Sequence, residues 1–170
     1  GASAAGHAKA LASWGADRVV IVESEAAPAP EAVARTLARL AAESAPAVVL
    51  LADGAESRVA APLLAEALDA PLFSDVVDIE AGDEVVFTRL PYTAKVIERA
   101  TAAAPTVVAT VRPKALPVPE ADASRTAEVV AAPADAADLA RIVQSVARAA
   151  SERVDLAEAD IVVAGGRGCK

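Results

Sequence analysis

An alternation of short apolar runs with longer segments of helical periodicity constrains the fold of this chain most strongly. Residues 18–22 and 47–51 are nearly all apolar, as expected of strands that are covered on both faces. A segment with apolar residues at helical spacing follows each run, first over 30–43 and then up to residue 68. Strand, helix, strand and helix at this spacing predict right-handed βαβ units and a parallel sheet.

The segments that flank this region have different patterns. Residues 4–14 are alanine-rich and predict a helix that ends at Gly15. After Pro71 the chain has short strand-like runs, and the Gly82-Asp83 pair predicts an antiparallel hairpin between the first two. These runs are residues 76–79, 85–89, 95–99 and 107–111. The predicted fold is therefore an α/β fold, with a mostly parallel sheet flanked by helices and one antiparallel hairpin.

The last third of the chain gives weaker signals. Three prolines between residues 113 and 119 predict an extended connector, and residues 126–130 predict one more strand. Residues 138–150 have helical spacing and predict a helix, although the same residues could lie extended along an edge. A polar linker over 151–159 then leads to a terminal strand.

Composition and charge exclude several classes of partner. The net charge is −8, which disfavours nucleic acid and anionic membrane surfaces because both are bound mainly through clustered Lys and Arg. With two Phe, one Tyr and one Trp, a base-stacking surface is not expected. No apolar run is long enough to span a bilayer, and no signal peptide opens the chain. One Cys forms no internal disulfide, which fits a cytoplasmic location.

The end of the sequence carries the first candidate binding motif. Residues 161–164 form a β-branched run that opens into Gly165, Gly166, Arg167 and Gly168. This pattern predicts a buried strand that leads into a glycine-rich loop, where backbone amides and an arginine could hold phosphate. The full G-x-G-x-x-G motif is absent, so an exposed glycine-rich tail is the alternative.

A second candidate lies at the predicted carboxyl end of the strand over 47–51. Residues 53–58 precede a helix at the edge where open α/β sheets bind ligands. Ser57 could touch a phosphate there, but helix capping is the favoured role.

The remaining polar residues form no catalytic set. His7 is the only histidine, so the usual zinc sites cannot be assembled, and it is expected to be exposed on its helix. Cys169 is expected to be a bystander, and Lys95 beside Tyr92 an ordinary strand lysine. Ser74, Asp75 and Asp78 suit turns and strand ends rather than a metal. No nucleophile, base and orienting group can be placed together, so we expect no enzyme activity.

Four segments together resemble the N-terminal domain of the electron transfer flavoprotein alpha subunit. Residues 61–76 resemble the family's helix, turn and Ser-Asp strand entry, and residues 110–115 its strand ending in Arg-Pro. Residues 88–95, Thr-Arg-Leu-Pro-Tyr-Thr-Ala-Lys, are similar to its Thr-Arg…Tyr-Ala-Gly-Lys hairpin. Residues 155–170 resemble its Asp-Leu lead into Val-Val-x-Gly-Gly-Arg-Gly.

The resemblance implies a role in electron transfer. Members of this family are heterodimers of alpha and beta subunits that carry FAD. They pass electrons from acyl-CoA dehydrogenases and related dehydrogenases of fatty acid β-oxidation to a quinone oxidoreductase. By resemblance, Arg167 contacts FAD, while Gly165, Gly166 and Gly168 let the backbone approach it. The N-terminal domain is an α/β scaffold and subunit interface, of the adenine-nucleotide hydrolase-like, Rossmann-like type, without catalytic residues.

The resemblance also implies a domain division. Residues 1–154 would be the scaffold domain, and residues 155–170 the linker with the first strand and loop of a truncated FAD-binding domain. The chain would then begin inside the family domain, and purified alone it would be colourless. Thr93-Ala94 replaces the family's Ala-Gly, and many members are extended over 138–148. The alternative functions are a free-standing ATP- or AMP-binding module that uses residues 53–58, and a structural protein without a ligand.

Overall fold

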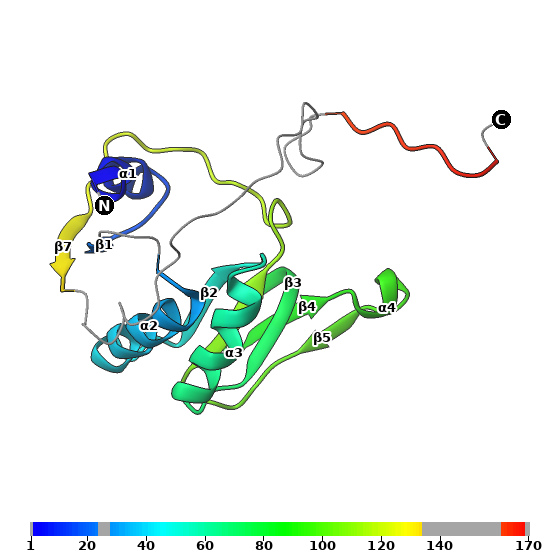
Figure 1. Ribbon diagram of the computed structural model, residues 1–170, viewed down its shortest axis with the longest axis horizontal. Helices are drawn as coiled ribbons and strands as arrows, with labels where there is room; N and C mark the ends of the chain where they lie inside the picture. The colour runs from blue at the N-terminus through cyan, green and yellow to red at the C-terminus, as the bar shows by residue number, and fades with distance from the viewer. Residues whose placement is uncertain (1, 24–27, 134–160, 169–170) are drawn as a thin grey trace.

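The computed structural model describes residues 2–23, 28–133 and 161–168, which form an α/β fold with a mostly parallel central sheet (Figure 1). In chain order the elements are α1 (Ala2–Ser13), β1 (Arg18–Val22), α2 (Pro30–Ser44), β2 (Val48–Ala52), α3 (Ser57–Ala67), β3 (Leu72–Ala81), β4 (Val85–Arg89), α4 (Pro91–Ala94), β5 (Glu98–Ala100), β6 (Val107–Val111) and β7 (Glu128–Ala132). Five strands form the central sheet in the order β2-β6-β3-β4-β5, and β1 pairs with β7 in a second sheet. The predicted fold class is confirmed.

The helices begin and end where local sequence signals place them. Pro30 opens α2, where its fixed φ suits the first turn and its missing N–H costs nothing. The same helix ends at Ala45, which adopts a left-handed conformation with φ 44° and donates its N–H to the carbonyl of Ala41. Gly15 follows α1 with φ +107°, a conformation that glycine adopts without steric cost. The predicted helix end at Gly15 is confirmed.

Strand β6 lies at the centre of the parallel part of the sheet, between β2 and β3. Its residues are almost all buried because the strand is covered on both faces. Val108 packs against α3, where it contacts a cluster that includes Leu64. Val107 and Ala109 point to the opposite face, as alternation along a strand requires, and pack with Phe87.

The antiparallel part of the sheet confirms the predicted hairpin. Strands β3 and β4 pair antiparallel up to the Ala81–Val85 pair, so residues 82–84 form the connecting loop. The hairpin is held from within by the stacked rings of Phe73 and Phe87, whose centroids are 4.8 Å apart. Strand β5 then adds to β4 on the outer side.

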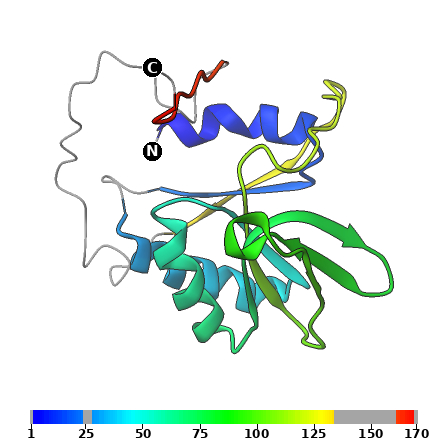
Figure 2. The ribbon, with the colours of Figure 1, turned by 90° about the vertical axis from the view of Figure 1, so that its right-hand side faces the viewer.

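The two-stranded sheet joins segments that are far apart in the sequence. Strand β7 pairs in parallel with β1, and α1 lies over this pair (Figure 2). The connector before β7 is held to the region after α1, because Asp122 donates its N–H to the carbonyl of Ser13 and Arg125 pairs with Asp17 at 2.8 Å. The alternation of strands and helices predicts that β1 continues the central sheet beside β2. In the structure β1 pairs with β7 instead.

Two predictions about strands need correction. The strand predicted over 95–99 is shorter and begins later: residues 95–97 form a turn and irregular chain after α4, and β5 covers residues 98–100, which are the ones that pair with β4. Strand β3 begins at Leu72, four residues before the predicted start, since its first residues pair with β6 before the rest pairs with β4.

The predicted buried strand at the end of the chain is not formed. Residues 161–166 have no regular structure and 161–168 are all exposed, including Val163 at 93%. A strand needs a neighbour for its backbone hydrogen bonds, and no described strand pairs with these residues. The helix predicted over 138–150, the linker over 151–159 and the domain boundary at 154 lie outside the described residues.

Candidate functional site

The carboxyl ends of β2 and β6 and the irregular part of β3 meet at one buried hydroxyl group. Thr110 of β6 is 2% exposed and donates a hydrogen bond to Oδ1 of Asp53, which follows β2, at 3.1 Å. The same hydroxyl accepts a hydrogen bond from the backbone N–H of Asp75 in β3 at 2.9 Å. One side chain therefore joins the ends of β2 and β6 to β3. Asp53 and Asp75 are among the candidate residues in the sequence, whereas Thr110 is not, because a threonine in an apolar strand gives no signal of its own.

Each carboxylate at this edge is also held by an arginine. Nη2 of Arg58, in the first turn of α3, lies 2.8 Å from Oδ2 of Asp53. Arg112, just after β6, binds Asp75 with two hydrogen bonds of 2.9 and 2.6 Å. The hydrogen bonds from Arg112 lower the pKa of Asp75 from its ordinary value, with smaller contributions from the charges of Arg112, Arg58 and Arg89. We call these five residues, Asp53, Arg58, Asp75, Thr110 and Arg112, the carboxyl-edge network.

An irregularity in β3 makes this network possible. The register between β3 and β6 shifts between Phe73 and Val76, and Asp75 has φ +57°. Non-glycine residues rarely adopt this left-handed conformation, which asparagine and aspartate tolerate best. The distortion allows the Asp75 backbone to reach Thr110 while its carboxylate binds Arg112.

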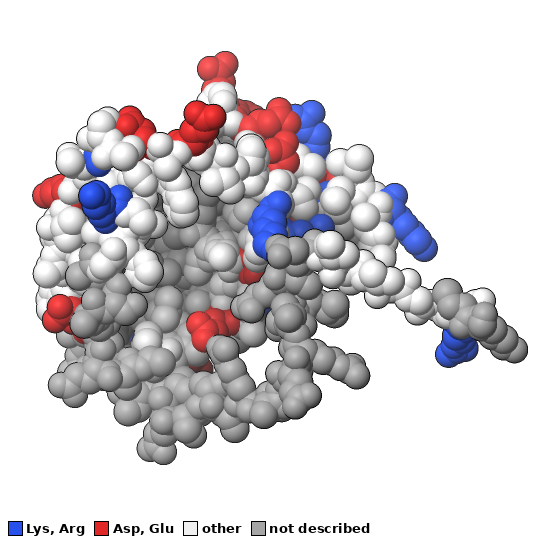
Figure 3. All heavy atoms as spheres, turned by 90° about the horizontal axis from the view of Figure 1, so that it is seen from above, with Lys and Arg blue, Asp and Glu red and all other residues white. Residues whose placement is uncertain are grey.

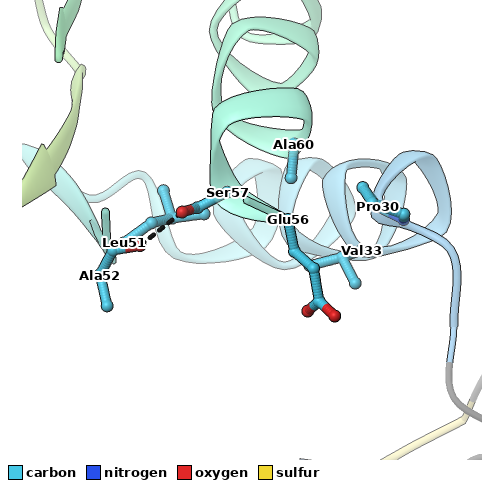
Figure 4. A pocket seen from close by; sticks show the side chains of 7 residues that line it. All are labelled: Pro30, Val33, Leu51, Ala52, Glu56, Ser57 and Ala60. Atoms are coloured by element: carbon cyan, nitrogen blue, oxygen red, sulfur yellow. Dashed lines mark hydrogen bonds between the residues drawn. The ribbon is translucent and has the colours of Figure 1, made fainter. Parts of the chain in front are cut away.

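A cavity of about 270 Å³ lies beside this edge, between the start of α2 and the start of α3 (Figure 4). The predicted role of Ser57 as a helix cap is wrong. Its hydroxyl donates to the carbonyl of Ala52 and accepts from the N–H of Gly54 at 2.9 Å. Among the described residues that line the cavity, Glu56 is the only charged one, and Figure 4 shows its carboxylate directed away from Ala60. An apolar cavity whose one charge is negative disfavours a phosphate group.

The other candidates lie apart from the network or outside the described residues. His7, Ser74, Asp78, Tyr92 and Lys95 are exposed. Among the described residues, no group of three or more His, Cys, Asp or Glu side chains could hold a metal ion. Cys169 is not described. On the face in Figure 3, acidic and basic side chains are interspersed, with no continuous basic surface among the atoms that are coloured.

The predicted flavin contacts lie in the exposed segment 161–168. An arginine and unhindered glycine amides suit the phosphate groups of a dinucleotide. A Cβ added to Gly166 or Gly168 would meet nothing within 4 Å. The donor chemistry of Arg167 and its neighbouring glycines therefore fits a flavin dinucleotide, but the described residues form no cradle around it.

Comparison with known proteins identifies the family. The family model described as "Electron transfer flavoprotein domain" matches residues 1–137. The chain is 32% identical over 166 residues to the electron transfer flavoprotein subunit alpha of Bacillus subtilis (strain 168). The aligned residues make up 96% of this chain and 51% of the relative. It is 34% identical to the subunit alpha of Syntrophomonas wolfei and 35% identical to that of Mycobacterium leprae, over 94% and 93% of this chain.

The chain spans about half the length of the curated relatives it matches. No helix in the described part of the chain combines the length and the apolar character needed to cross a membrane. The matched relatives are all named as alpha subunits, and the family match covers the whole of the described α/β fold up to residue 133. The chain belongs to the electron transfer flavoprotein family and is similar to its alpha subunits.

Proposed function

We propose that this chain is the scaffold and subunit-interface part of the alpha subunit of an FAD-dependent electron carrier. The observation that carries the proposal is the carboxyl-edge network. Open α/β sheets commonly bind ligands at this edge, through free donors at the strand ends. Here Arg58 and Arg112 are each bound to a carboxylate, and Thr110 joins the carboxylate of Asp53 to the backbone N–H of Asp75. An edge whose polar groups bind one another supports a rigid scaffold better than a ligand site.

The finer features of the proposal come from the resemblance to the family. The carrier would accept electrons from acyl-CoA dehydrogenases and related dehydrogenases and pass them to a quinone oxidoreductase, in the cytoplasm. It would be an electron carrier rather than an enzyme, and a heterodimer with a beta subunit. Arg167 would contact FAD, with Gly165, Gly166 and Gly168 allowing close approach. Residues 1–154 would form the scaffold and residues 155–170 the start of the flavin domain.

Co-expression with an electron transfer flavoprotein beta subunit from the same organism tests the proposal. We expect a complex that survives size-exclusion chromatography, because an alpha-subunit scaffold needs a surface for its partner. The chain purified alone should be colourless, since the described residues form no cradle for the flavin. Absence of any complex would contradict the interface role, and a stoichiometric flavin spectrum from the chain alone would contradict the scaffold role.

A free-standing nucleotide-binding module is the second candidate. The cavity beside Ser57 favours it, because that cavity lies at the sheet edge where nucleotides bind in related architectures. The apolar lining and Glu56 oppose it. Isothermal titration calorimetry with ATP and with AMP separates the two candidates. Micromolar binding by the chain alone would establish the module, and no measurable heat of binding would leave the scaffold.

A further inference from the structure

We draw no further inference here: the strongest candidate, the exposed apolar connection between β4 and β5 that carries Tyr92 and Ile97, supports none because nothing in the structure shows what covers it.

Discussion

Replacement of Thr110 by valine tests the carboxyl-edge network most directly. Valine has nearly the shape of threonine, so the change removes the hydroxyl group and little else. Thr110 is 2% exposed, so water does not readily replace its two hydrogen-bond partners. The variant leaves Oδ1 of Asp53 and the N–H of Asp75 without the partner that each has in wild type.

The expected loss follows from the two hydrogen bonds. A hydrogen bond to a charged group contributes about 1.5–3 kcal/mol, and the Asp53 side chain is only 7% exposed. Loss of the partner of the Asp75 N–H adds about 1 kcal/mol, which gives a total of about 2.5–4 kcal/mol. Thr110→Ser keeps the hydroxyl and deletes one buried methyl group, at about 1 kcal/mol. The serine variant should therefore be the more stable of the two.

Urea unfolding followed by far-UV circular dichroism measures this order. The free energies of unfolding should rank wild type, then Thr110→Ser, then Thr110→Val. Thr101→Val is the control, because Thr101 is exposed and the same change there should shift the midpoint little. If Thr110→Val were as stable as Thr110→Ser, the hydroxyl would not join the strand ends in the way described, and the reasoning would be refuted.

Three further substitutions test other parts of the structure. The pKa of Asp75 is lowered in the folded chain, so its ion pair with Arg112 stabilises the fold at pH values above the unfolded pKa and stops doing so as the pH falls through the folded pKa. The difference in urea midpoint between wild type and Asp75→Asn should therefore shrink in acid, below the ordinary pKa of 3.8. Ala45→Gly should raise the free energy of unfolding by about 1 kcal/mol, because Ala45 is left-handed with φ 44°. The control, Ala42→Gly inside α2, should lower it by a similar amount. A lower urea midpoint for Ala45→Gly than for wild type would contradict the left-handed helix end. Phe87→Ala should cost about 3–5 kcal/mol in the same assay, since Phe87 is fully buried and stacks on another ring; a loss below that of Ile79→Val, a partly buried neighbour, would argue against this core.

Much of the fold can be predicted from local patterns in the sequence. The alternation of strand and helix over residues 18–68, the helix end at Gly15 and the hairpin at Gly82-Asp83 all depend on residues close together in the chain. Apolar periodicity and turn residues carry this information locally, so they indicate the elements without knowledge of their neighbours. The strand predicted over 161–164 was wrong because an apolar run does not reveal whether another strand lies beside it.

Only part of the candidate site could be predicted in the same way. Asp53 could be placed at a strand end, but no local pattern indicates that Asp53 and Asp75 bind the same hydroxyl group. That arrangement depends on the register of β6 against β2 and β3 and on the bulge near Asp75. The role of Ser57 was misjudged for a related reason, because the loop before α3 folds back and uses its hydroxyl.

The sequence by itself therefore determined the order of the elements, the parallel character of the sheet and the family resemblance that the comparisons confirm. The tertiary structure decided which strands pair, including β1 with β7, and which polar groups meet at the carboxyl edge. It also decided the left-handed conformation over residues 92–94. The physical reason is that periodicity and turn propensity act between neighbours in the chain, whereas register, burial and strain are set by contacts between residues far apart in the sequence.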